Sequence, residues 1–386
     1  MANPVASPGA RKQASASSAP NRAKFQSIWM VLHRYVGLVC SLFVLIVFAT
    51  GSLLIVEKPL DRWLAPELLT VPVDAREPIG VEAVLRDIDS HYPGRTPAFI
   101  EPPQQPGDPY RVALDSLFGT HVYIDPRDGR ILGDRSALRS VMAPLFLLHT
   151  GYIGGKAGWY VVGALGIAIL GLAATGAWLW WPRRGQWRKH LRIRGGDGIY
   201  RWLRDGHRSL GLMLLPWTIL ITLTGTLIIY HDSTEKVLAV VSGKEELFKT
   251  PAIVPGEKAV RVRDGLDAAI ARVVAEQDAG TTLSYVALPV KAGDAIQLRL
   301  HAPSEWHPYG RTAAFLDPRD FSVLAYEHWQ RTGWAGRAFN SLYPLHTGDY
   351  GGWWGLTIHF VMGWVGVLFA ISGVWMWWRR RPSKRR

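Results

Sequence analysis

The sequence predicts an α+β membrane protein in which four transmembrane helices form a bundle and two small α+β domains lie outside the membrane. Three observations predict this fold class. Four apolar runs are long enough to cross a bilayer, the basic residues gather beside those runs, and the second half of the chain repeats the first. Each repeat contains two spans, so both copies run in the same direction. A pseudo-two-fold axis along the membrane normal should relate them.

Composition and charge argue against a nucleic-acid-binding protein. The chain has 386 residues, 48% of them hydrophobic, with 18 tryptophans and a formal net charge of +13. Residues 1–27, 182–208 and 379–386 carry +4, +7 and +6, whereas 57–158 and 232–354 sum to −3 and −2. The positive charge therefore flanks apolar runs, which is typical of a membrane protein in a lipid bilayer and not of a nucleic-acid surface.

The four predicted spans contain almost no charge. They have no Asp, Glu or Lys, and Arg34 is their one basic side chain. The first run is too long for a signal-peptide core, so we interpret it as a retained helix. We find no signal of a broken helix in any of the four. The predicted spans cover residues 28–56, 159–181, 209–231 and 355–378.

The basic stretches predict the topology. With an even number of spans both termini lie on one side, and the positive-inside rule places that side in the cytoplasm. We therefore expect a disordered cytoplasmic tail at 1–27, a basic cytoplasmic loop at 182–208 and a basic cytoplasmic tail at 379–386. The segments 57–158 and 232–354 then face outward.

Each outward-facing segment is predicted to hold helices on an antiparallel sheet. Stretches such as "GTHVYIDPRDGRIL" and "AIQLRLHAP" alternate apolar and polar residues, as strands do, whereas 80–91 and 260–277 have helical spacing. The sequence Asp-Pro-Arg-Asp occurs at 125–128 and 317–320 and is typical of a turn. We interpret it as a hairpin turn without chemistry.

The internal repeat is defined by matched motifs. "HRYVGL" at 33–38 matches "HRSLGL" at 207–212 at an offset of 174, which also relates Thr50-Gly51 to Thr224-Gly225. "LHTG" at 148–151 recurs at 345–348, an offset of 197, which also relates Trp180-Trp181 to Trp377-Trp378. Equivalent residues should lie at equal depth around a shared axis.

Four of the twelve histidines occupy repeated positions, and they are the candidate cofactor ligands. His33 pairs with His207 near the cytoplasmic ends of spans one and three, and His149 pairs with His346 before spans two and four. Two histidine pairs at two depths of one bundle suit bis-imidazole ligation of two haem irons. Simple ancestry of a duplicated gene is the competing account of the repeated histidines. Gly37 and Gly211, one helical turn after the first pair, are expected to leave room for a flat ligand.

The remaining polar residues offer weaker candidates. His359 lies inside span four and is an alternate ligand for the outer haem, and His231 is a second alternate without repeat support. The segment "HAPSEWHPYG" at 301–310 is interpreted as a surface loop, with substrate contact as the alternative. The single Cys40 excludes a disulfide framework and a cysteine-based metal or Fe–S site, and a four-ligand zinc site or a proton relay lacks the carboxylates it needs.

Several motifs carry a family resemblance. "HRYVGL", the repeated "LHTG", the "DPRD" hairpins and the helix ends "WLWWPRR" and "WMWWRRR" resemble the PepSY-associated transmembrane family over about residues 25–381. Within it the chain resembles iron-regulated inner-membrane proteins of Gram-negative bacteria linked to siderophore uptake. The resemblance implies periplasmic PepSY-like domains, b-type haem and an enzyme that reduces ferric siderophore and releases Fe(II).

The histidine pairs and the resemblance together predict an electron path. Electrons would pass from the haem of His33 and His207 to the haem of His149 and His346, and then to a ferric siderophore docked between the outer domains. The chain has no dinucleotide or P-loop fingerprint, so we expect quinol or another protein as the donor. The alternatives are a non-enzymatic PepSY scaffold or regulator with structural histidines, and a transporter of siderophore or iron.

Overall fold

The computed structural model describes residues 19–73, 76–181, 185–194, 198–248, 251, 264–291 and 293–379. Several parts of the predicted topology fall partly outside these ranges. They are the N-terminal tail up to residue 18, residues 182–184 and 195–197 of the basic loop, the C-terminal tail from residue 380, and residues 74–75, 249–250, 252–263 and 292 of the outward-facing segments, which include the start of the helical stretch expected at 260–277.

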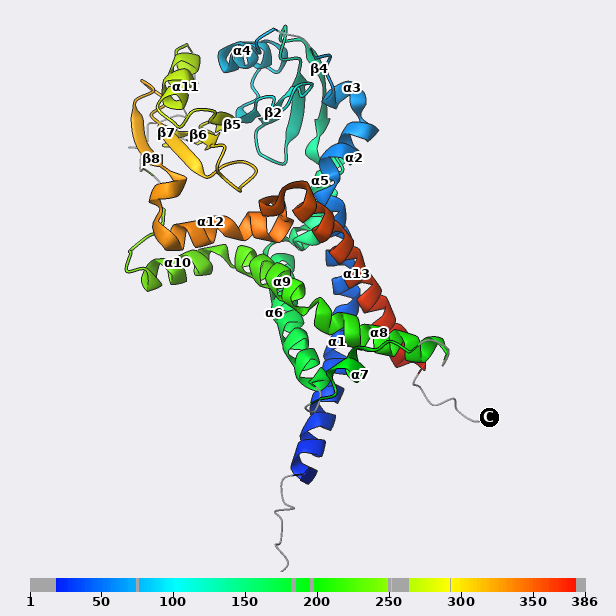
Figure 1. Cartoon of the computed structure of the whole chain (residues 1–386). Coiled ribbons are helices and arrows are strands. Elements are labelled where there is room, and N and C mark those ends of the chain that lie inside the picture. The colour runs from blue at the N-terminus through cyan, green and yellow to red at the C-terminus, as the bar shows by residue number, and fades with distance from the viewer. Residues whose placement is uncertain are drawn as a thin grey trace, which may run out of the picture.

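Apolar helices long enough to cross a membrane coincide with the predicted spans (Figure 1). Three do so as single helices, α1 (Ala19–Ile55), α6 (Gly155–Trp180) and α13 (Gly352–Arg379). The fourth crossing needs two helices, α8 (Ile199–Met213) and α9 (Leu215–Ile229), whose axes differ by 66°. The chain is therefore a membrane protein, and its described residues include three helices that can span alone and one bent pair that can form a fourth span.

The bend corrects the expectation of an unbroken third span. Pro216 lies in the first turn of α9. It has no backbone N–H to donate, and its ring crowds the carbonyl one turn earlier, so the helix cannot continue straight through this point. Helical bonding resumes where the backbone N–H of Thr218 donates to Leu214 over 2.9 Å. The local signal, a proline inside an apolar run, was present in the sequence.

The two predicted outer domains share one antiparallel sheet of eight strands. The strand order is β4-β3-β2-β1-β5-β6-β7-β8, so two four-stranded units meet at their β1 and β5 edges. Phe99 pairs with Ala287 and Ile100 with Val286 across this junction. Pairing satisfies backbone groups that would otherwise be exposed at two sheet edges. The strands are β1 (Pro97–Glu101), β2 (Tyr110–Leu114), β3 (Thr120–Ile124), β4 (Ile131–Ser136), β5 (Thr282–Ala287), β6 (Ile296–His301), β7 (Thr312–Leu316) and β8 (Val323–Glu327).

One hydrophobic core serves both units. Helices α4 (Val81–His91) and α11 (Leu266–Ala275) cover the face of the sheet that points away from the bundle (Figure 1). Val84 and Ile88 of α4 and Val273 of α11 are fully buried in the same cluster.

The first turns of α4 and α11 also cap each other. Glu82 Oε1 accepts from the backbone N–H groups of Gly265 and Asp267, at 2.8 and 3.0 Å, and Asp267 Oδ2 accepts from the N–H of Glu82 at 3.3 Å. Helix N-termini favour such carboxylates, so the exchange joins the two copies at a second place.

Both Asp-Pro-Arg-Asp segments form hairpin turns, as expected. Asp125 and Asp317 open the turns between β3 and β4 and between β7 and β8, and each accepts from the backbone N–H and the guanidinium of the arginine two residues later. The arginine hydrogen bonds lower the pKa of each aspartate to about 2. The motif thus has a structural role in both copies.

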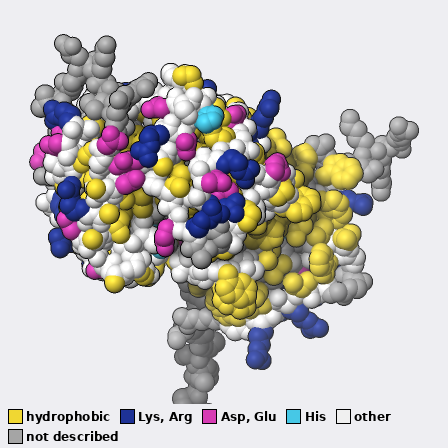
Figure 2. All heavy atoms as spheres, turned by 90° about the horizontal axis from the view of Figure 1, so that it is seen from above, with side chains coloured by type: hydrophobic (Ala, Val, Ile, Leu, Met, Phe, Trp, Pro, Cys, Tyr) yellow, Lys and Arg dark blue, Asp and Glu magenta, His cyan; other side chains and the backbone are white. Residues whose placement is uncertain are grey.

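Short helices connect the sheet to the bundle. Of these, α12 runs between the sheet and the membrane helices (Figure 1). Figure 2 shows the separation in surface chemistry, with mixed charges over the sheet and apolar side chains over the helices. The remaining elements are α2 (Glu57–Leu64), α3 (Pro66–Leu69), α5 (Met142–His149), α7 (Trp187–Leu191), α10 (His231–Val241), α12 (Gly333–Thr347) and the 3-10 turns Ala137–Arg139, Tyr152–Gly154, Trp329–Arg331 and Asp349–Gly351. We call the end of the bundle under the sheet the sheet side and the opposite end, beside α7, the basic side.

Candidate functional site

The histidines of the two "LHTG" motifs face each other at the sheet side of the bundle. His149 ends α5, which packs on α1, and His346 lies in the last turn of α12, which packs on α9. Their ring centroids are 6.0 Å apart and the ring planes differ by 45°. Two imidazoles that bind one metal from opposite sides have centroids about 6 Å apart, because each metal–nitrogen bond is roughly 2 Å long. The pair therefore has the spacing of axial ligands.

Hydrogen bonds select the ring nitrogen that each histidine can offer. Nδ1 of His149 lies 2.9 Å from the carbonyl of Val47, and Nδ1 of His346 lies 2.9 Å from the carbonyl of Ile221. A neutral imidazole that donates through Nδ1 keeps the lone pair of Nε2 for a metal. Both copies thus have the tautomer that suits ligation.

Two glycines make this arrangement possible. A Cβ atom on Gly51 would lie 2.8 Å from Cε1 of His149, and one on Gly225 would lie 2.6 Å from Cε1 of His346. Only a residue without a side chain allows such an approach. Gly37 and Gly211, which were expected to leave this room, are less tightly packed, because a Cβ there would meet its nearest neighbour at 3.9 and 3.4 Å. In the sequence, the repeated Thr-Gly motif was the signal for Gly51 and Gly225, the two glycines that lie close to the histidines.

The second histidine pair lies toward the basic side. His33 lies on α1 and His207 lies on α8. His33 Nδ1 contacts Thr175 Oγ1 at 2.9 Å, whereas His207 packs against the ring of Phe369 at 4.8 Å. The buried Nδ1 of His207 has no hydrogen-bond partner among the described residues.

The two pairs lie at different depths. His33 and Val47, the α1 residue bound by His149, are 14 positions apart, which corresponds to about 21 Å along a helix. Among the described residues there is no group of three or more His, Cys, Asp or Glu side chains suited to a metal ion. The facing imidazoles of His149 and His346 fit haem, which supplies the equatorial ligands itself, better than they fit tetrahedral zinc.

The alternate ligands have other partners. His359 is buried between two backbone carbonyls, with Nδ1 2.9 Å from Gly355 and Nε2 3.2 Å from Leu345. Neither nitrogen is left for a metal in this arrangement. His231 is exposed and paired with Asp232 at 2.9 Å. The structure therefore favours His346 over His359 as the partner of His149.

A cavity of about 300 Å³ lies between the sheet and the sheet side of the bundle. Phe146, one turn before His149, contributes to its wall. Several of its charged groups are paired, among them Arg111 with Glu101 and Arg135 with Asp61. The lining residues are Glu57, Lys58, Asp61, Arg62, Leu69, Glu101, Pro102, Gln104, Asp108, Pro109, Arg111, Leu117, Phe118, His121, Tyr123, Arg135, Ala137, Ser140, Met142, Ala143, Phe146 and Tyr309.

The loop at 301–310 joins this cavity to the histidine pair. Tyr309 lines the cavity, with the Lys58 ammonium 5.2 Å from its ring centroid. His307 contacts Tyr309 and Tyr343 at centroid distances of 6.2 and 5.0 Å, and Tyr343 lies one turn before His346. Burial, helped by nearby arginines, lowers the pKa of His307 to about 3, so the ring is neutral. The segment is a surface loop, as expected, with Trp306 63% exposed, and its Tyr309 also lines the cavity.

Glu57 gives the cavity a group that titrates near neutral pH. It opens α2 directly after the first span and lines the cavity. Burial raises its pKa to about 7, against the opposing effect of Lys58. Its repeat counterpart is His231, so the repeat provides no second carboxyl group at this position.

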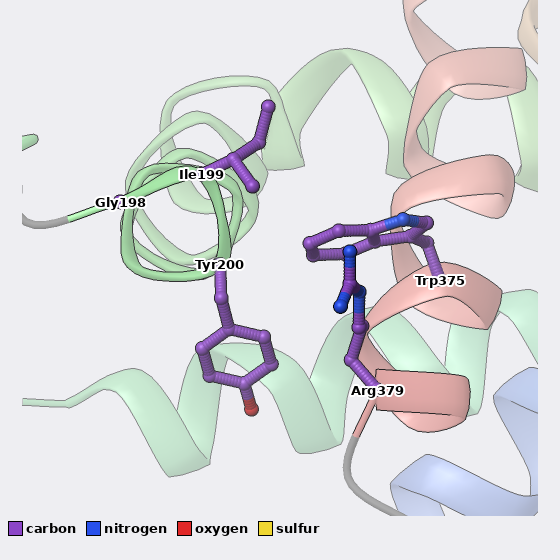
Figure 3. Close-up of a pocket in the computed structure, with 5 residues that line it drawn as sticks. All are labelled: Gly198, Ile199, Tyr200, Trp375 and Arg379. Atoms are coloured by element: carbon purple, nitrogen blue, oxygen red, sulfur yellow. The ribbon is translucent and has the colours of Figure 1, made fainter.

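The basic side has a shallow hollow of its own. Figure 3 shows Tyr200 of α8 beside Trp375 and Arg379 of α13. The aromatic rings are 6.2 Å apart, and the Arg379 guanidinium lies 5.3 Å from the Trp375 ring. Aromatic residues with a basic neighbour are typical of a membrane–water boundary, which agrees with the expected aromatic and basic end of span four.

Comparison with known proteins assigns the chain to a family. The family described as PepSY-associated TM region matches residues 30–380. The chain belongs to this family. An uncharacterized protein of Pseudomonas aeruginosa is 28% identical over 265 residues, which cover 62% of this chain. The match spans 64% of that relative, a little under two thirds of its length. Family membership establishes that the chain is a PepSY-associated membrane protein. Its chemistry has to be argued from the histidine pairs and the cavity.

Proposed function

We propose that this PepSY-associated protein is an inner-membrane di-haem reductase that passes electrons to a ferric siderophore in the periplasm and releases Fe(II). The observation that carries the proposal is the His149–His346 pair, with ring centroids 6.0 Å apart and both Nδ1 atoms bonded to carbonyls. A purely structural role for these histidines explains neither the distance between their rings nor the Nε2 atoms that are left free for a metal. The pair of His33 and His207 provides a second level in the same bundle.

The histidines would hold two b-type haems. His149 and His346 would ligate the outer one and His33 and His207 the inner one, and the haems would supply reversible one-electron chemistry. The protein's own contribution is to fix the imidazoles. The carbonyls of Val47 and Ile221 hold the outer rings in one tautomer, and Gly51 and Gly225 let them approach the helices.

The cavity between the sheet and the bundle is the proposed position of the ferric chelate. It is bounded by paired charges and by Phe146, and Tyr309 and His307 separate it from Tyr343 and His346. Reduction weakens the complex because hard oxygen donors suit Fe(III) better than Fe(II). With a pKa of about 7, Glu57 can hold a proton for a chelator oxygen that leaves the iron.

The orientation follows from the charge pattern. The positive-inside rule places the basic side in the cytoplasm and the sheet in the periplasm. Electrons would then enter at His33 and His207 from quinol or a protein donor and leave on the sheet side.

A transporter is the second candidate, since the bent span favours it. Helices broken within the membrane are common at transport sites, and α8 and α9 meet at such a break. Uptake of labelled siderophore into proteoliposomes without any electron donor would support transport over reduction. If the protein is instead a scaffold or regulator with structural histidines, we expect neither siderophore uptake nor a haem spectrum.

The proposal is tested by anaerobic Fe(II) release. Chemically reduced protein is mixed with ferric siderophores of different donor types, and Fe(II) is trapped with a coloured chelator. We expect release by the wild type and loss of release by His346→Ala, with His231→Ala as the matched control at an exposed histidine. Equal release by the wild type and His346→Ala would reject the proposed path.

A further inference from the structure

Helix α10, which lies outside the four spans, has an exposed apolar face. Val237, Val240 and Val241 are 61, 77 and 66% exposed. They are three or four positions apart, so they lie on one side of the helix. Single exposed apolar side chains are common on proteins, but a group of them on one face marks a surface that binds a partner or a membrane. The described part of the chain provides no cover for this face.

The opposite side of α10 is packed against α12. Ala239 of α10 and Ala335 of α12 are buried in one small apolar cluster, and Leu238 and Phe339 pack against it. Positions 238 and 239 lie on the other side of the helix from the three valines, because successive residues are turned by about 100°. Helix α12 therefore covers one side of α10 and leaves the valines on the other.

The connection to α9 holds α10 at the sheet-side end of the bent span. Tyr230 is the single residue between the two helices. The backbone N–H of Thr234 donates to the carbonyl of Tyr230 at 2.9 Å, and the Thr234 hydroxyl donates to the carbonyl of Leu227 in α9 at 2.9 Å. In Figure 1 α12 lies between α10 and the sheet. The valines, on the side away from α12, therefore point away from the sheet and toward the level of the membrane helices.

We propose that α10 lies in the sheet-side surface of the lipid bilayer, with Val237, Val240 and Val241 in contact with acyl chains. An amphipathic helix in this position buries its apolar face about 5–10 Å into the boundary between headgroups and acyl chains. The exposed Lys236, beside Val240 on the helix, extends its ammonium to the headgroup phosphates. A second protein is a poorer fit, because three valines offer far less than the roughly 800 Å² per partner of a stable interface. The inference does not depend on the proposed haem chemistry.

Spin labelling of the full-length protein in vesicles of phosphatidylethanolamine and phosphatidylglycerol tests the proposal. A nitroxide is attached to Val240→Cys, and separately to Val237→Cys, after the one native cysteine is removed by Cys40→Ala. Collisions of the nitroxide with O₂, which concentrates in lipid, are compared with collisions with a water-soluble nickel chelate. We expect O₂ to dominate at both positions. The lipid reference is Val361→Cys at an exposed position of α13, and the water reference is Ser90→Cys at an exposed position of α4.

Two results would overturn the inference. The first is dominance of the nickel chelate at Val237→Cys and Val240→Cys, as at the water reference, because it would place the valine face in water. The second is broadening of the Val240→Cys spectrum that disappears when labelled protein is diluted with unlabelled protein before reconstitution. That result would assign the face to a second copy of the chain. The use of two labelled positions separates a local effect of one substitution from the position of the helix.

Discussion

Replacing Gly225 by alanine tests the geometry of the outer histidine pair. The new Cβ would lie 2.6 Å from Cε1 and 3.1 Å from Nδ1 of His346, whereas carbon atoms normally approach to about 3.5 Å. The ring must retreat by about 1 Å, and its 2.9 Å bond to the carbonyl of Ile221 is lost. Loss of such a supporting bond typically weakens metal binding 10–100-fold, or about 1.4 to 2.7 kcal/mol.

The assay is haem content per chain, measured by extraction and by absorbance in the purified protein. We expect Gly225→Ala to lose part or all of one haem on dilution while the second haem stays bound. Gly37→Ala is the matched control, because its Cβ would meet its nearest neighbour at 3.9 Å. Both changes raise helix propensity equally, and retention of the second haem shows that Gly225→Ala is folded. Equal haem content and equal affinity in the two variants would refute the reasoning.

Three further predictions concern single side chains. His359→Ala should keep both haems and lose heat stability, whereas His346→Ala should lose one haem; the reverse result would transfer the ligand role to His359. Asp125→Asn should lower the free energy of unfolding by about 2 kcal/mol at pH 7, as measured by denaturant titration. The loss should shrink as the pH falls from 4 to 2, because the wild-type carboxylate, whose pKa is lowered to about 2, becomes protonated in that range. Burial raises the pKa of Glu57 to about 7, so the stability of the wild type should fall between pH 4.5 and 7, where the carboxyl ionises in the unfolded chain but keeps its proton in the folded one. Glu57→Gln should flatten that part of the profile of melting temperature against pH, and an unchanged profile would contradict the raised pKa.

The sequence predicted the features that depend on local pattern and on the repeat. Apolar runs define the membrane helices, and the equal offset of the two "LHTG" motifs predicted that His149 and His346 face each other. The repeated Thr-Gly motif was visible as well. Its role became clear only in the structure, because Gly225 meets a histidine more than a hundred positions away in the chain.

Other features depend on contacts between the copies. Pairing of β1 with β5 and the exchange of caps between Glu82 and Asp267 join residues more than 180 positions apart, and neither strand edge has a sequence signal for its partner. The cavity also depends on contacts between the copies, because Tyr309 comes from the second copy and most of the other lining residues come from the first. Pro216, by contrast, is a local signal in the sequence for the bend between α8 and α9.

The central claim is that the two histidine pairs hold two haems. A reduced-minus-oxidised absorption spectrum of protein purified from haem-replete cells, with haem quantified per chain, tests it most directly. We predict two b-type haems per chain and a Soret band that shifts on reduction. Colourless protein that is folded and fails to take up added haem would contradict the account.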